Sequence, residues 1–150
     1  MKEFIYDIIL DENQAKKIVR RLIYTFFKGN IQKKKLMVKG ELKDKTRFSF
    51  KRPFNSSYDT KACTPHMLNE VFSDGELYVL RHYNYKNNQL PLFLASNSQI
   101  QADLEDIDNI FFYEYSYIFD KNFSYCFFVT DSVVLENEKN VALLNIYEPI

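Results

Sequence analysis

A chain of 150 residues that is 46 % hydrophobic, with three glycines and four prolines, is typical of one folded domain and excludes a low-complexity or disordered protein. The formal net charge is zero, but residues 1–65 hold 16 basic and 7 acidic side chains, whereas residues 66–150 hold 4 and 13. The halves therefore carry +9 and −9. This split predicts either a bipolar surface that orients a charged partner or two halves that neutralise each other across the fold.

The first two elements are a strand over residues 4–10 and a helix over residues 12–28. Apolar residues recur in the second segment at spacings of three and four, which is the period of one helix face. We expect Asp11 to be the N-cap, Gln14 to complete a capping box, and Gly29 to end the helix. The opposite face of this helix is basic, with Lys16, Lys17, Arg20, Arg21 and Lys28.

The middle of the chain mixes short strands and helices. Alternating residues 36–51, with a turn at 43–45, predict a basic hairpin. Thr64 and Pro65 predict the start of a short helix that runs to Phe72, and strands are expected at 77–82 and 90–95. Residues 96–108 predict one or two helical turns whose buried side is Ile100, Leu104 and Ile107.

The last third has the strongest strand signal. We expect strands at 110–119 and 123–130, then at 132–135 and 141–147, joined by polar turns. The order of elements predicts a single α+β domain over residues 1–150. Its architecture would be one mostly antiparallel sheet, with a long N-terminal helix packed on one face and a second short helix.

Motifs for catalysis or metal binding are weak. Cys63, His66, His82 and Cys126 are the candidates for a metal site or a nucleophile and base, but their spacing does not bring four zinc ligands together. No nucleophile elbow, glycine-rich phosphate loop or HExxH pattern is present. No apolar run is long enough to span a bilayer, and acidic residues interrupt the start of the chain. We therefore expect a soluble, cytoplasmic, non-enzymatic protein without metal, cofactor or membrane contact.

Two features favour binding to another protein. Tyr113, Tyr115 and Tyr117 alternate on one face of the predicted strand 110–119, and tyrosine is a common interface anchor. The alternative is that these rings pack beneath the helix at 12–28. The second feature is the acidic stretch with Glu105, Asp106 and Asp108, which can face a basic partner.

Nucleic acid is the other partner that the sequence suggests. Between Lys16 and Arg52 there are 14 basic residues and two acidic ones, with Tyr24, Phe48 and Phe50 among them. Cations neutralise phosphates and rings stack on bases. The candidate contacts are Lys17, Arg20, Arg21, Lys39, Arg47 and Lys51. This alternative describes a basic-faced accessory protein of a phage or mobile element that engages nucleic acid or a nucleoprotein defence complex.

Two segments of the last third resemble a known class. Residues 106–113, DIDNIFFY, are an acidic lead-in to an aromatic segment, and residues 120–130, DKNFSYCFFVT, place a cysteine before two aromatic residues. Together they resemble the C-terminal part of small bacterial immunity proteins that accompany polymorphic toxins. The resemblance implies a cytoplasmic α+β inhibitor that binds one toxin and blocks it, with no catalytic residue. An immunity or antitoxin protein that acts by occlusion is therefore the leading hypothesis.

Overall fold

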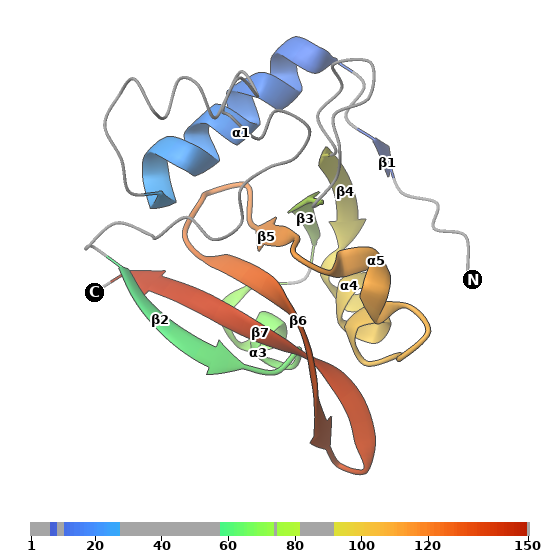
Figure 1. Ribbon diagram of the computed structural model, residues 1–150. Coiled ribbons are helices and arrows are strands. Elements are labelled where there is room, and N and C mark those ends of the chain that lie inside the picture. Colours follow the sequence, from blue (N-terminus) through green and yellow to red (C-terminus); the bar gives the residue numbers. More distant parts are fainter. Residues whose placement is uncertain (1–6, 9–10, 28–57, 74, 82–91, 150) are drawn as a thin grey trace.

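The computed structural model describes residues 7–8, 11–27, 58–73, 75–81 and 92–149 (Figure 1). Within these residues, seven strands form one sheet in the order β1-β4-β3-β5-β6-β7-β2, and every neighbouring pair is antiparallel. The predicted α+β class with an antiparallel sheet is confirmed. The elements are β1 (Asp7–Ile8), α1 (Glu12–Phe26), β2 (Tyr58–Cys63), α3 (Met67–Val71), β3 (Glu76–Leu80), β4 (Leu92–Ser96), α4 (Asn97–Leu104), α5 (Ile110–Tyr113), β5 (Tyr117–Phe119), β6 (Cys126–Glu136) and β7 (Lys139–Pro149).

Helix α1 begins where the sequence predicts and ends early. The Asp11 carboxylate accepts from the backbone N–H groups of Asn13 (3.0 Å) and Gln14 (3.4 Å), as an N-cap does. The helix ends at Phe26 instead of residue 28, because Phe27 takes an extended conformation and its ring packs 5.2 Å from the ring of Tyr117. The proposed terminator Gly29 lies outside the described residues.

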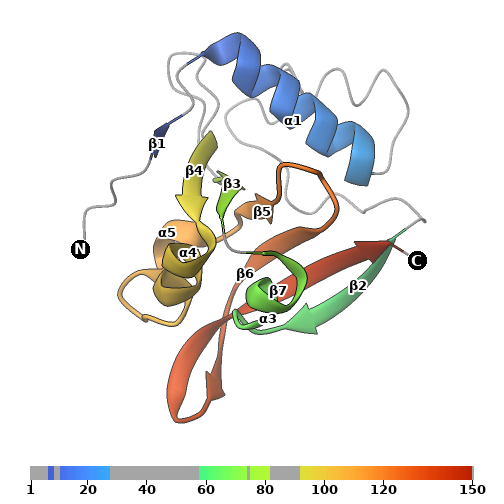
Figure 2. The same cartoon turned by 180° about the vertical axis from the view of Figure 1, so that it is seen from behind.

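Alternation along the strands divides the apolar side chains between two cores. One face of the sheet carries Leu80, Tyr117 and Phe119, which pack against Leu22 and Phe26 of α1. The other face carries side chains such as Val79, Ile118 and Phe127, which pack with residues of α3, α4 and α5. Figure 2 shows α3 and α4 in front of the strands on that second side. The described helices therefore cover both faces of the sheet.

Three predictions about the last third are wrong. Residues 110–113 form helix α5 instead of a strand, because Ile110 and Tyr113, one helical turn apart, are both buried. Residues 126–136 form one continuous strand instead of two. Ile107 is 45 % exposed instead of buried, because α4 ends at Leu104 and the helical period ends with it.

The start of α3 also differs from the prediction. His66 is the N-cap instead of Thr64, and no side chain caps the helix, because the Thr64 hydroxyl contacts the imidazole of His66 instead of a helical N–H. The predicted hairpin 36–51, most of the strand 4–10 and the turn before β4 lie outside the described residues. Within the described part of the chain, no helix combines the length and apolar character needed to cross a membrane.

Candidate protein-binding surface

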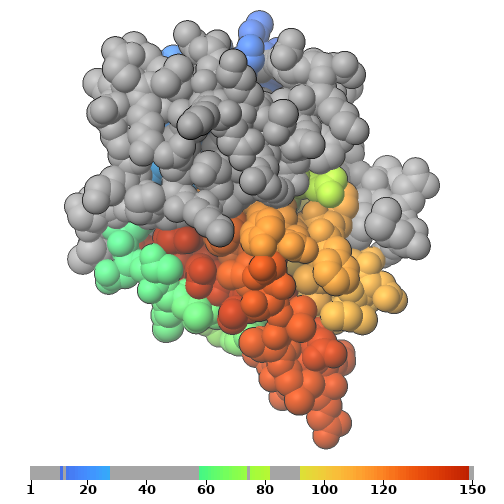
Figure 3. Space-filling model, in the orientation of Figure 1, coloured from blue at the N-terminus to red at the C-terminus, as the bar shows by residue number. Residues whose placement is uncertain are grey.

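The distal part of the β6–β7 hairpin, residues 131–142, projects from the body of the protein and is called the arm here (Figures 1 and 3). It projects because the neighbouring strands stop: β5 pairs only with residues 126–128 of β6, and β2 pairs only with residues 144–149 of β7. The tip is a two-residue turn at Asn137 and Glu138, whose φ angles of 50° and 66° suit a type I′ hairpin. The arm is therefore a two-stranded ribbon beyond the edge of the sheet.

A β-bulge joins the arm to the sheet. Val129 pairs with Leu144 and Val133 pairs with Ala142, so residues 130–132 stand opposite Leu143 alone. The Thr130 hydroxyl donates to the carbonyl oxygen of Leu143 (2.7 Å) and accepts from the N–H of Ser132 (3.2 Å), which holds the extra residues in place. Bulges bend a strand and increase its twist. The bulge therefore sets the direction in which the arm leaves the sheet.

Tyr115 fastens the base of the arm. Its backbone has a φ of 61°, its N–H donates to the carbonyl oxygen of Val129 (2.8 Å), and its hydroxyl donates to Asp131 (2.7 Å). Its ring stacks on Phe128 at 6.1 Å. The hydrogen bond to Asp131, followed by burial, raises the pKa of the Tyr115 phenol. A left-handed conformation is uncommon for a tyrosine and persists only where surrounding contacts fix it.

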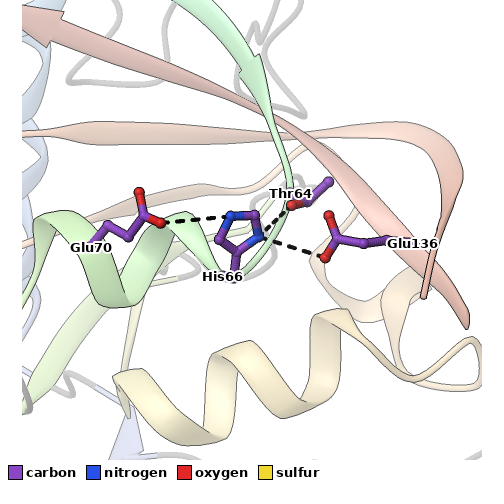
Figure 4. Close-up of polar contacts among 4 residues, drawn as sticks. All are labelled: Thr64, His66, Glu70 and Glu136. Carbon is purple, nitrogen blue, oxygen red and sulfur yellow. Dashed lines mark hydrogen bonds and ion pairs between the residues drawn. The ribbon is translucent and has the colours of Figure 1, made fainter.

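A polar cluster fastens the far end of the arm to α3 (Figure 4). The Nδ1 atom of His66 lies 2.7 Å from the Thr64 hydroxyl and 3.6 Å from the Glu136 carboxylate at the end of β6, and Nε2 lies 3.7 Å from Glu70. Both carboxylates are beyond hydrogen-bonding distance of the ring, so neither fixes a tautomer for general-base chemistry. The cluster therefore links the arm to α3 and lacks the carboxylate hydrogen bond that would orient His66 as a base for the Thr64 hydroxyl.

An open hollow of about 420 Å³ lies between the arm and the α4–α5 loop, residues 105–109. Glu105, Asp106 and Ile107 line it from the loop, and Lys139 and Asn140 line it from the arm. Asp106 also orders the loop, because its carboxylate accepts from the N–H of Asp108 (3.0 Å) and the amide of Asn109 (3.0 Å). The two walls are thus each held by their own contacts.

Large apolar side chains are exposed on the loop, on the arm and on helix α5, and one of them, Ile107, lines the hollow. In the described ranges, the exposed large hydrophobic residues are Ile107 (45 %), Phe111 (71 %), Val133 (44 %) and Leu135 (73 %). Ile107 lies in the loop, Phe111 lies in the following helix α5, and the other two lie on the arm. Single exposed apolar residues are ordinary, but four that lie on the loop, on the helix that follows it and on the arm indicate a binding surface. We call these four residues the apolar patch.

The structure separates the six residues predicted to bind a partner. Glu105, Asp106 and Asp108 lie in the loop beside the hollow, and Tyr115 is partly exposed at the base of the arm. Tyr113 and Tyr117 are both 0 % exposed and cannot anchor a partner, which corrects that prediction. Tyr113 points inward because its hydroxyl donates to buried Asp103 (2.7 Å), and Tyr117 packs beneath α1 against Phe27. The alternative, that the rings pack beneath the helix at 12–28, holds for Tyr117, whereas Tyr113 is buried in the opposite core with residues of α4 and α5.

The apolar patch itself was not predicted from the sequence. Val133 and Leu135 belong to the predicted strand 132–135, and Ile107 was predicted to lie on the buried side of a helix. The sequence offered no signal for it, because the three-residue length of β5, past which residues 126–136 continue, is known only from the structure.

The residues predicted to bind nucleic acid are only partly placed. Lys17, Arg20 and Arg21 are exposed on α1, and the guanidinium of Arg21 lies 4.4 Å from the ring centre of Phe123. Lys39, Arg47 and Lys51 lie outside the described residues. The described portion therefore carries one short basic face and does not test the larger patch.

The candidate metal and thiol residues do not converge where they are described. Cys63 is partly buried, and burial, followed by the charge of Glu148, raises its pKa to about 12. Cys126 is fully buried, and this burial raises the pKa of its thiol well above the ordinary value. Both shifts favour the thiol over the nucleophilic thiolate. No group of three or more metal-ligating side chains occurs in the described ranges, and His82 lies outside them.

No family model, curated protein or solved structure matches the chain.

Proposed function

We propose that this chain is a non-catalytic protein-binding module that neutralises a partner protein by occlusion, with the arm and the α4–α5 loop as its contact surface. One observation carries the proposal: the exposed large apolar residues of the described ranges all lie on the loop and the arm that line the hollow or on α5, the helix that follows the loop. Burying a leucine or phenylalanine side chain yields about 1.5–3 kcal/mol. Four such residues are enough to form the centre of an interface.

The arm is suited to this role because it is held before any partner arrives. The bulge, the hydrogen bond between Tyr115 and Asp131, and the contact between His66 and Glu136 restrain a ribbon that would otherwise have only two strands. Isolated two-stranded ribbons are marginally stable. A surface ordered in advance loses less conformational entropy on binding. The contacts at the base and tip therefore support recognition and not only folding.

An immunity or antitoxin role is the form of this function that the resemblance favours. Such a protein blocks a toxin by covering its active surface, which requires an exposed contact surface and no catalytic group. The arm meets the first requirement. Expression beside the cognate toxin would test this narrower role, because cells carrying an immunity protein survive and cells carrying an arm variant do not.

Affinity capture from the producing cell tests the broader proposal. The wild-type chain should capture a protein that is then identified, purified and titrated. The double variant Phe111→Ser/Leu135→Ser should bind it at least about 100-fold more weakly, since two central apolar anchors are lost. The matched control Lys17→Ser/Arg20→Ser alters two exposed residues of α1 and should bind like the wild type. Equal capture by the arm variant would rule out the arm as the contact surface.

Nucleic-acid binding is the second candidate, and the exposed basic face of α1 favours it. Lys16, Lys17, Arg20 and Arg21 are all exposed there. A salt-dependent mobility shift with DNA or RNA, abolished by Arg20→Glu/Arg21→Glu, would support it. The absence of any shift at low ionic strength would remove it.

A further inference from the structure

The charge around the apolar patch identifies the kind of partner that fits it. We infer, as an extension of the proposed function, that the arm docks into a cationic groove of a partner protein, of the kind that binds a polyanion. The loop and arm together present the carboxylates of Glu105, Asp106, Asp108, Asp131, Glu136 and Glu138 with Lys139 as their basic residue, a balance of −5 from six acidic and one basic side chain.

Several of these carboxylates form no ion pair with the part of the chain that the structure describes. Within the described residues, no ion pair involves Glu105, Asp108 or Glu138, although Lys139 and the imidazole of His66 lie in the same region. Carboxylates that are left unpaired when an interface forms lose their hydration without compensation. A partner that covers the apolar patch must therefore supply cations at its rim.

The same charges disfavour the other occupants. A second copy docking through the same patch would bring −5 against −5, and like-charge contacts weaken association. Nucleic acid would be repelled for the same reason. The cationic face of α1 on a second copy has the right sign, but none of the exposed large apolar residues in the described ranges lies on α1. A separate protein that combines cationic and apolar surface satisfies both requirements.

The shape of the arm agrees with this partner. The arm is a narrow projection, as the space-filling view shows (Figure 3). Acidic residues lie at the tip of the arm and along the loop beside it. Projecting negative charge is attracted into clefts lined by positive charge, because such clefts focus the electric field and accelerate association. The interaction should therefore depend on salt mainly through its association rate.

The test uses two probes: the purified protein that the wild-type chain captures, and heparin as a polyanion. Glu105→Gln/Glu138→Gln should lower the association rate about 10-fold at low salt, and the difference should fall to about 2-fold or less at high salt, where exposed charges are screened. The control Asp59→Asn/Glu148→Gln removes the same net charge from the paired strands β2 and β7 and should leave the rate unchanged. Heparin should compete with the wild-type chain for the partner.

Three outcomes would overturn the inference. If the neutralised variant associates at the wild-type rate and heparin does not compete, while Phe111→Ser/Leu135→Ser abolishes binding, the partner surface is not cationic and only this inference fails. If none of the variants loses binding, the proposed function fails as well. If sedimentation shows that the arm mediates a salt-sensitive dimer of this chain, the occupant is a second copy and the inference is wrong.

Discussion

Replacing Tyr113 with phenylalanine tests where the tyrosines of the last third belong. The substitution removes one hydroxyl, which donates to the Asp103 carboxylate at 2.7 Å in the core formed by α4 and α5. Asp103 is 1 % exposed and also accepts from the side-chain amide of Gln99 (2.8 Å). The ring keeps its packing in the variant, so the change isolates the hydrogen bond.

The expected cost follows from the burial of the acceptor. Hydrogen bonds to charged groups contribute about 1.5–3 kcal/mol, and a buried acceptor that loses a donor is not rescued by water. A loss of about 2 kcal/mol lowers the melting temperature of a domain of this size by about 4–8 °C. Urea and thermal unfolding followed by far-UV circular dichroism measure both quantities. Partner binding by folded Tyr113→Phe should match the wild type.

Tyr115→Phe is the matched control. Its hydroxyl also donates to a carboxylate at 2.7 Å, but Asp131 is exposed to solvent, so the melting temperature should change by no more than about 1 °C. Equal destabilisation of the two variants would show that burial does not set the strength of these bonds. If Tyr113→Phe is as stable as the wild type but fails to bind the partner, the Tyr113 hydroxyl takes part in binding, and the assignment of Tyr113 to the core alone is wrong.

Two further predictions concern ionisation. Because the Cys63 pKa is about 12 and its ordinary value is 9.0, the thiol should react with disulfide reagents about 10²–10³-fold more slowly in the folded protein than in urea, and Glu148→Gln should raise the folded rate. Burial and then the charge of Asp131 raise the pKa of Glu114, so folding favours its protonated form. The stability contributed by Glu114 is therefore fully present below its ordinary pKa of 4.5 and is lost as the pH rises through the folded value. Glu114→Gln should raise the free energy of unfolding in urea by less than about 1 kcal/mol at neutral pH and leave it unchanged below the ordinary pKa of Glu114. A gain in stability that persists in acid would refute the electrostatic cause.

Local signals in the sequence were enough for α1 and its N-cap. The period of 3.6 and the carboxylate of Asp11 act within a few residues, so they do not depend on the rest of the fold. The same holds for the polar turn between β6 and β7 and for their antiparallel pairing, because the two strands are adjacent in the chain. These local features were enough to predict the α+β fold class.

Residues 110–119 show what local reasoning misses. Their alternating aromatics match a strand, yet the buried hydrogen bond from Tyr113 to Asp103 spans ten positions and favours the helical turn α5. The apolar patch was missed for a related reason. Whether Val133 and Leu135 are covered depends on which other segments pack over that part of β6, and both are exposed in the structure. Periodicity reports the face on which a residue lies and not whether anything covers that face.

Deleting Asp131 and Ser132 tests whether the bulge directs the arm. The deletion leaves Thr130 opposite Leu143 and Val133 opposite Ala142, so the pairing becomes regular. Removing two residues also preserves the alternation of side chains, so Val133 and Leu135 stay on the same face of the strand. The variant should therefore fold and unfold cooperatively in urea. Its arm should follow the straight path of the sheet instead of the path set by the bulge.

Binding to the captured partner should then fall at least about 10-fold, although every residue of the apolar patch is still present. The control Asp131→Asn/Ser132→Ala keeps the length of the bulge and removes the carboxylate and hydroxyl, and it should bind far better than the deletion. If the control loses as much affinity as the deletion, the chemistry of those two side chains matters and the geometry of the bulge does not. If both variants bind like the wild type, the direction of the arm is irrelevant to recognition, and the surface that contacts the partner must lie on the body of the sheet.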